Sequence, residues 1–220
     1  MTEILTSLSS QLSSADFWSA LGSTVSGWLL GLTIAVIIGG VGGILIASFR
    51  ILDRLLSSTV EFLRPIPSVA LVPVAALLFG TSMEATLLLV VFASTWQVLV
   101  QVIYGVRDVD KVALETARTY RLGTVRTIRS VMLPSLMPYL IIGVRLAAAV
   151  ALILQITGEL IIGTPGLGRL ISVAQSSAAV PTMYALVLVS AFLGVLINSG
   201  MRMAEGKVLF WHASIRGDQK

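Results

Sequence analysis

The sequence contains no cysteine and one histidine, His212. The first absence excludes disulfides, thiolate metal sites and a cysteine nucleophile, and a lone imidazole cannot form a two-histidine metal site. Charged residues are also scarce: they make up 12% of the 220 residues, whereas a soluble domain carries roughly 25%. Because 56% of the residues are hydrophobic, the composition predicts a membrane protein. We assign His212 no role and expect no nucleic-acid partner, since the net charge of +4 is distributed as in a membrane protein.

Motifs for chemistry within the chain are missing as well. The one Gly-Lys pair, Gly206-Lys207, is followed by Val208, so no G-x-x-x-x-G-K-[ST] phosphate-binding loop occurs. The long apolar runs contain serines but no histidine or lysine to activate them. We therefore predict that the chain is not an enzyme and binds no metal or cofactor of its own.

Apolar runs of the length needed to cross roughly 30 Å of hydrocarbon recur along the chain. The expected spans are residues 27–47, 68–80, 85–106, 138–158 and 183–201. The second is short and contains Pro73, so we expect a kinked helix there. It should begin near Ser68, because Pro65 and Pro67 disfavour helix immediately before them. Polar loops are expected at 50–64 and from Glu159 to about Pro181.

The positions of lysine and arginine predict the orientation, because cytoplasmic loops carry an excess of both. Thirteen of the fifteen lie in 50–64, in 107–134 and from Arg202 onward, while Arg169 is alone in its loop and Arg145 alone within a span. The prediction is an all-α membrane protein of about five spans, with the N-terminus outside and the C-terminus cytoplasmic. Its parts would be an extracytoplasmic tail at 1–16, the membrane domain at 17–212 and a cytoplasmic tail at 213–220.

The basic segment 108–134 is unlike its surroundings because charged and apolar residues alternate along it. Asp108 and Asp110 are suitable helix caps, and Gly123 separates a first short helix from a second that Thr124 could cap. Apolar residues follow a helical period in both halves: Leu114, Ala117, Tyr120, then Val125, Ile128, Val131. The pattern predicts a cytoplasmic helix–turn–helix before a span with Pro134 in its first turn. On these residues alone, a lipid-anchoring helix and a docking surface for a soluble partner are equally supported.

The spacing in this segment resembles the coupling signature of ABC-importer permeases. That signature reads Glu-Ala-Ala, three residues, Gly, nine residues, an aliphatic residue, one residue, then Leu-Pro. The matching residues are Glu115, Ala117, Val131, Leu133 and Pro134. Thr116 replaces the first alanine, and Arg121 stands where the glycine belongs. We therefore expect Gly123 to supply the turn instead.

The flanking stretches 52–80 and 133–171 are similar to those of nitrate/sulfonate/taurine permeases, and the resemblance covers roughly residues 18–212. It implies the type I ABC importer permease fold, a location in the cell inner membrane, and contact with membrane lipid. It also implies three protein partners: a cytoplasmic ATPase that holds ATP and Mg, a second permease copy, and an extracytoplasmic solute-binding protein. The residues implied to contact the ATPase are Glu115, Ala117, Arg118, Tyr120, Arg121, Leu122 and Gly123.

Polar residues within spans are costly and usually face cavities or partner helices. The candidates for a translocation path are Ser94, Gln97, Arg145, Gln155 and Glu159. Gln155 and Glu159 share a helix face, so an interhelical hydrogen-bond network is the alternative for them. For Arg145 the alternatives are snorkelling and an ion pair with a carboxylate. Two G-x-x-x-G pairs, Gly27/Gly31 and Gly39/Gly43, permit close helix approach within the subunit or in a dimer.

Other functions stay open at this point. Within transport, the solute could be a quaternary amine or another small organic molecule. From another class, the chain could be a membrane scaffold with a lipid-binding helix and no transport role. A self-contained secondary transporter has less support, because no inverted repeat is visible.

Overall fold

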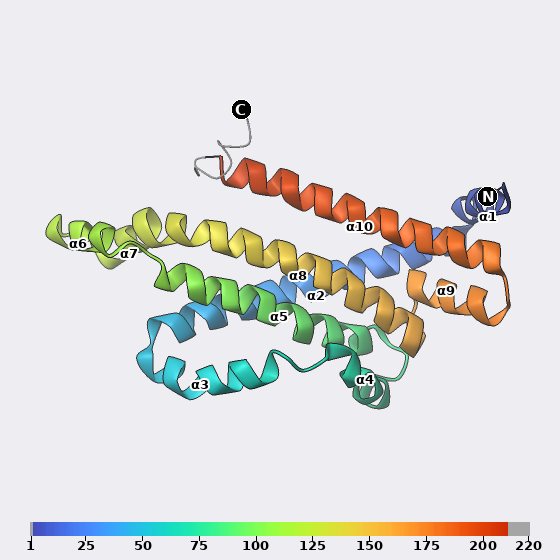
Figure 1. The fold of residues 1–220 in the computed structure, drawn as a ribbon, viewed down its shortest axis with the longest axis horizontal. Helices are drawn as coiled ribbons and strands as arrows, with labels where there is room; N and C mark the ends of the chain where they lie inside the picture. Colours follow the sequence, from blue (N-terminus) through green and yellow to red (C-terminus); the bar gives the residue numbers. More distant parts are fainter. Residues whose placement is uncertain (1, 211–220) are drawn as a thin grey trace. The chain divides into compact units, whose positions relative to one another are not determined.

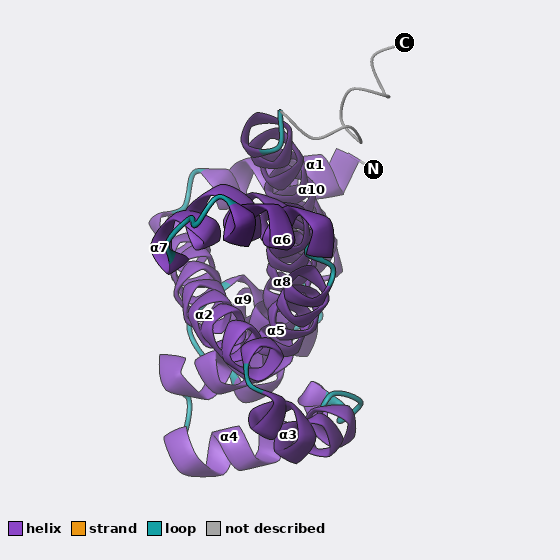
Figure 2. Cartoon of the chain, turned by 90° about the vertical axis from the view of Figure 1, so that its left-hand side faces the viewer, coloured by secondary structure: helices purple, strands orange, loops and turns teal. Residues whose placement is uncertain are grey.

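A computed structural model describes residues 2–210. Within that range every regular element is helical, which confirms the all-α class (Figures 1 and 2). The cytoplasmic tail expected at 213–220 lies outside the described residues, as does His212. The helices are α1 (Thr2–Leu12), α2 (Ala15–Ser48), α3 (Arg50–Leu63), η1 (Ser68–Leu71), α4 (Val72–Phe79), α5 (Met83–Arg107), α6 (Lys111–Thr119), α7 (Thr124–Thr127), η2 (Ile128–Met132), α8 (Leu133–Ile162), α9 (Leu167–Ser176) and α10 (Val180–Val208).

Four helices of the described chain are long and apolar enough to cross a membrane: α2, α5, the helix from Thr124 to Ile162, and α10. The broken pair formed by α3 and η1–α4 would make a fifth if it were counted as one span. The apolar runs therefore predicted the spans well, except the second. That segment begins at Ser68 as expected, but a 3-10 turn comes first and Pro73 lies in the first turn of α4 instead of kinking it.

Three segments expected to lack regular structure are helical. The N-terminal tail contains α1, the loop at 50–64 is α3, and the loop after Glu159 contains α9. In α9 the buried residues Leu167, Ile171 and Ala174 recur at helical spacing and pack in the core. The polar and glycine-rich composition concealed the helical period of the apolar residues, because α9 buries one face and α3 buries no residue.

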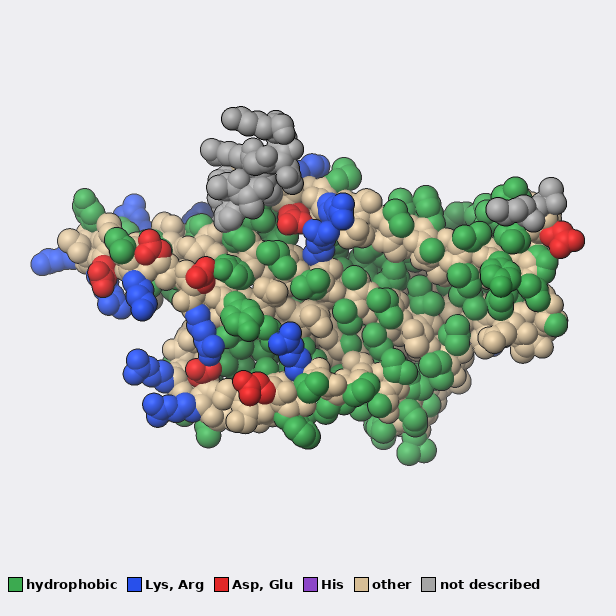
Figure 3. Space-filling view, viewed as in Figure 1, with side chains coloured by type: hydrophobic (Ala, Val, Ile, Leu, Met, Phe, Trp, Pro, Cys, Tyr) green, Lys and Arg blue, Asp and Glu red, His purple; other side chains and the backbone are tan. Residues whose placement is uncertain are grey.

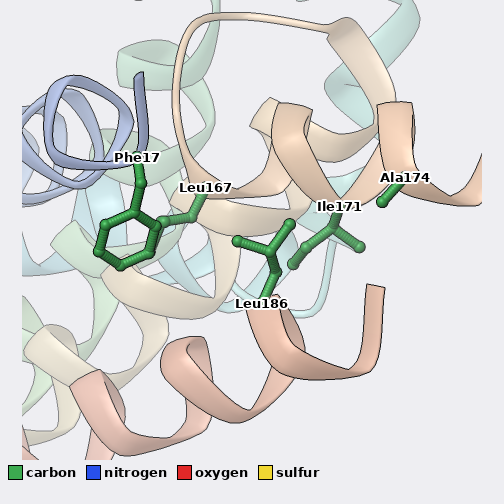
Figure 4. Close-up of a cluster of buried hydrophobic side chains, with 5 residues drawn as sticks. All are labelled: Phe17, Leu167, Ile171, Ala174 and Leu186. Carbon is green, nitrogen blue, oxygen red and sulfur yellow. The ribbon is translucent and has the colours of Figure 1, made fainter. Parts of the chain in front are cut away.

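The described chain forms two compact units, and each is considered by itself. Unit 1 comprises residues up to 35, 66–94 and 148–199, and unit 2 comprises 36–65, 95–147 and the residues from 200. The core of unit 1 joins α2, α9 and α10 through five buried side chains (Figure 4): Phe17, Leu167, Ile171, Ala174 and Leu186. In unit 2, Ile46, Leu99 and Ile103 form a smaller cluster against which Val60 of α3 packs.

The glycines of α2 are used for packing within the chain. In unit 1, Gly31 faces Val90 of α5 so closely that an added Cβ would lie 2.5 Å from its Cγ1. In unit 2, a Cβ at Gly39 would lie 2.7 Å from the Thr95 carbonyl oxygen, and one at Gly43 would lie 2.8 Å from the Val102 Cβ. Small residues let two membrane helices approach closely, so these glycines set the α2–α5 contact in both units.

Candidate coupling segment and buried polar network

The predicted helix–turn–helix is present, and Asp110 caps its first helix. The Asp110 carboxylate accepts a hydrogen bond from the Val112 N–H at 2.8 Å. Asp108, expected as an alternative cap, instead accepts a hydrogen bond from the Tyr139 hydroxyl of α8. One aspartate thus starts α6, and the other ties the segment to the following span within unit 2.

The turn after α6 is a Schellman motif in which Arg121 adopts the left-handed conformation. The Leu122 N–H donates to the Ala117 carbonyl at 2.9 Å, and the Arg121 N–H donates to the Arg118 carbonyl at 2.9 Å. This pattern requires a positive φ at the residue after the C-cap, which here is Arg121, and glycine is therefore favoured at that position. Arg121 has φ 51° and occupies the position of the signature glycine.

The expectation that Gly123 supplies this turn is therefore wrong. Gly123 has φ −61° and ψ 160°, which any residue can adopt, and it is the residue before α7. Thr124 is the first helical residue and not a cap. The signature spacing predicted the place of the turn correctly, whereas the preference for glycine pointed two residues too far along the chain.

The segment exposes apolar and basic side chains together. Tyr120 and Val125 expose 77% and 80% of their surface, although both belong to the apolar stripes expected from the sequence. Among the residues expected at an ATPase contact, Ala117 is buried, Leu122 is half-buried, and the others are exposed. Figure 3 shows basic side chains over α6 and α7, with a few acidic side chains among them. A surface of this composition fits a soluble partner that buries the apolar residues and carries acidic groups.

A buried carboxylate joins three helices of unit 1. Glu159 on α8 is fully buried, and its Oε2 accepts hydrogen bonds from the Thr24 hydroxyl of α2 and the Gly168 N–H of α9, both at 2.9 Å. Its Oε1 accepts from Gln155 Nε2 at 2.9 Å. Thr24 Oγ1 in turn accepts from the Leu167 N–H at 2.9 Å. The alternative of an interhelical network for Gln155 and Glu159 is therefore realised.

The Gly-Leu-Gly sequence at 166–168 packs directly against this carboxylate. A Cβ at Gly166 would collide with the Glu159 carboxylate, and a Cβ at Gly168 would collide with the Ile156 carbonyl oxygen. Leu167 between them is fully buried. The start of α9 is thus packed against α8, where its N–H groups favour a negative charge.

The other candidates for a translocation path have different surroundings. Arg145 forms an ion pair with Glu205 of α10 at 3.1 Å in unit 2, and both side chains are partly exposed. Ser94 is buried in unit 1, and Gln97 is half-buried in unit 2. A role of these residues in translocation stays a prediction. Sequence reasoning missed Thr24, because the first span was expected to begin at Gly27; a threonine three residues before an apolar run was the available signal.

These features define a multi-pass membrane protein with a helix–turn–helix between two of its long apolar helices. Residues 39–209 match the family described as binding-protein-dependent transport system inner membrane component. The chain therefore belongs to this family of ABC importer permeases.

Named relatives and solved structures agree with this assignment. The chain is 26% identical to the taurine transport system permease protein TauC of Escherichia coli over 92% of this chain and 74% of that protein. It is 28% identical to the bicarbonate transport system permease protein CmpB of Synechococcus elongatus over 83% and 66%. A chain of the MetNI methionine ABC transporter superposes with a TM-score of 0.71 at 17% identity, covering 84% of this chain and 93% of that one. This likeness confirms the permease fold.

Proposed function

We propose that this permease imports a small sulfonate or another small oxyanion, and that residues 108–134 dock on a separate cytoplasmic ATPase. The observation that carries the proposal is the exposure of Tyr120 and Val125 among four exposed arginines, Arg118, Arg121, Arg126 and Arg129. Exposed apolar side chains of this size in a water-facing segment favour a protein partner.

The mechanism we propose is a rigid-body switch. ATP and Mg are held by the partner ATPases, whose closure moves the docked segments of two permease copies together and rocks their spans between two packings. The Schellman turn at Arg121 fixes the angle between α6 and α7, so the segment moves as one body. Such a switch requires ATP and solute to favour different states. A solute-binding protein delivers the solute from outside.

We propose a specific part for Glu115 in this docking. Its side chain is exposed, and it makes no ion pair within the described residues. We propose that it pairs with a basic group of the ATPase, while the surrounding arginines face acidic groups. Complementary charges of this kind mainly govern specificity and the rate of association.

The proposed solute class comes from the relatives. Taurine and bicarbonate, for which two of them are named, are both small and carry an anionic oxygen group. Within the spans, the proposed contributors to the path are Ser94, Gln97, Arg145, Gln155 and Glu159. Uptake of radiolabelled taurine, bicarbonate and glycine betaine into proteoliposomes containing the complete importer would test the class. ATP-dependent uptake of glycine betaine alone would replace the oxyanion with a quaternary amine.

Co-purification tests the docking step. The chain in detergent should retain its partner ATPase, and Glu115→Arg and Tyr120→Asp should each weaken the association at least about tenfold, which corresponds to about 1.4 kcal/mol. Glu3→Arg on α1 makes the same charge change far from the segment in the sequence and should leave the association unchanged. Equal association of all variants would refute the docking role of 108–134, and the family membership would be unaffected.

A further inference from the structure

Helix α3 has an apolar face that nothing in the described chain covers. Ile51, Leu55 and Phe62 expose 74%, 68% and 72% of their surface, and no residue of this fully described helix is buried. At 100° per residue these three side chains point within about 40° of one another. The helix therefore presents large apolar side chains near both of its ends on one face (the apolar stripe), with the small polar residues Ser58 and Thr59 between Leu55 and Phe62.

The opposite edge of α3 attaches it to unit 2. Asp53 forms an ion pair with Arg107 of α5, and Val60 packs against the cluster of Ile46 and Ile103. Asp53 and Val60 lie about 140–180° from the stripe on the helical wheel. Since the helix is held by its far edge, the apolar stripe is directed away from the rest of unit 2.

The third side of α3 is basic. Arg50 and Arg54 are exposed and lie about 60–140° from the stripe on the helical wheel, and Glu61 shares this side two turns further along. Figure 3 shows basic side chains over α3, with acidic side chains among them. An apolar stripe flanked by arginines is the pattern of a helix that lies in the interface of a bilayer, with its apolar face at the acyl boundary.

We infer that α3 lies along the headgroup layer of the membrane as a surface helix that binds anionic phospholipid. It has 14 residues and is about 21 Å long, which is shorter than the roughly 30 Å hydrocarbon layer. Inserting it across the membrane would also place Arg50, Asp53, Arg54 and Glu61 in hydrocarbon, which is costly. One residue, Phe49, separates it from the end of α2, so α3 begins where a span leaves the membrane.

Charge complementarity selects lipid over a second protein as the occupant. The arginines flank the stripe on one side, where the phosphates of an anionic leaflet would lie, and basic residues near a membrane surface are attracted to such lipids. The pair α3 plus η1–α4 would then contribute one membrane-entering segment, η1–α4, instead of a bent span. This assignment is independent of the ATPase docking and of the solute.

Depth measurements on single-cysteine variants test the inference directly, because the sequence has no cysteine that would add background. Ile51→Cys, Leu55→Cys and Phe62→Cys of the full chain are spin-labelled in phosphatidylcholine nanodiscs with phosphatidylglycerol, and relative accessibility to oxygen and to a nickel chelate gives their depth. The three labels should lie at equal, shallow depth in the acyl region, and Glu61→Cys should report the aqueous or headgroup layer. A crossing helix would instead separate labels 51 and 62 by about 16 Å in depth.

Two further results would overturn the inference. Nickel-accessible labels at all three stripe positions would show that lipid does not cover α3, and spin–spin broadening between chains would identify a second copy as the occupant. In discs without phosphatidylglycerol, we expect the label at position 55 to become several-fold more accessible to nickel. The variant Arg50→Gln/Arg54→Gln should lose this dependence on anionic lipid. If the nickel accessibility depends on anionic lipid equally in the glutamine variant and in the protein with its native arginines, the arginines are not the lipid ligands.

Discussion

Replacing Glu159 by alanine should destabilise unit 1 by removing three hydrogen bonds at once. The carboxylate accepts from Thr24 Oγ1, Gln155 Nε2 and the Gly168 N–H, each at 2.9 Å. A side-chain hydrogen bond in a membrane protein contributes about 0.6 kcal/mol on average and at most about 1.7. We therefore expect Glu159→Ala to lower the free energy of unfolding by about 2–5 kcal/mol.

The glutamine variant separates the effect of charge from that of hydrogen bonding. In Glu159→Gln the amide oxygen can still accept from Thr24 and Gly168, and the Gln155 amide can turn so that its oxygen accepts from the new NH2 group. Orientation of such amides follows the network. The expected loss is about 1 kcal/mol or less. Unfolding in mixed micelles by increasing sodium dodecyl sulfate measures both variants, with Gly22→Ala, where an added Cβ meets nothing within 4 Å, as a control that should not destabilise.

Two outcomes would contradict this reasoning. If the free energy of unfolding of Glu159→Ala is within about 0.5 kcal/mol of the parent value, as for surface substitutions, the carboxylate does not hold the helices together. If Glu159→Gln is as damaging as alanine, the negative charge matters and the count of hydrogen bonds does not. A double-mutant cycle with Thr24→Val should give a coupling of about 0.5–2 kcal/mol, because the two side chains are in direct contact.

Three further substitutions follow from the geometry, each measured by the same unfolding assay. Arg121→Gly should stabilise the chain by about 1 kcal/mol, because a left-handed conformation costs a non-glycine residue about 1–2 kcal/mol. Gly123→Ala, at an ordinary φ, is the control. Unchanged stability of Arg121→Gly would argue against the left-handed turn. Gly39→Ala should destabilise by about 1–3 kcal/mol through overpacking, whereas Gly40→Ala, with open space around it, should not, and equal effects would contradict the α2–α5 contact. Arg145→Gln should cost about 0.5 kcal/mol or less, since its ion pair is partly exposed, and a loss that persists in high salt would contradict this assignment.

The membrane character could be predicted from the composition, and the long spans from the apolar runs. Long apolar runs must become helices in a bilayer, because every backbone polar group has to be paired within the segment. Local chemistry was equally readable at Asp110, where a short acidic side chain precedes a helix. In both cases neighbouring residues decide the outcome.

Where distant residues decide, the sequence was insufficient. Glu159 and Thr24 are 135 residues apart, and nothing in either neighbourhood identifies the other as its partner. Helix α3 was predicted as a loop because its apolar residues are interspersed with arginines and serines. The helical spacing of Ile51, Leu55 and Phe62 indicates an amphipathic helix only when a lipid surface is considered as the partner of the apolar face. At Arg121, the backbone hydrogen bonds at the end of α6 override the intrinsic preference of the residue.

The polar contacts of the two units differ in strength, and this difference bears on where the permease can rearrange. In unit 1, neutral donors from α2, α8 and α9 hold one fully buried carboxylate, and a shift of about 1 Å would lengthen those hydrogen bonds beyond useful range. In unit 2, the ion pair of Arg145 and Glu205 is partly exposed, and a partly exposed pair contributes at most about 1 kcal/mol. We therefore expect α8 and α10 to separate in unit 2 before α9 leaves α8 in unit 1. Hydrogen exchange would then remain slow at the Gly168 N–H while α10 exchanges around Glu205, and the reverse order would refute this account.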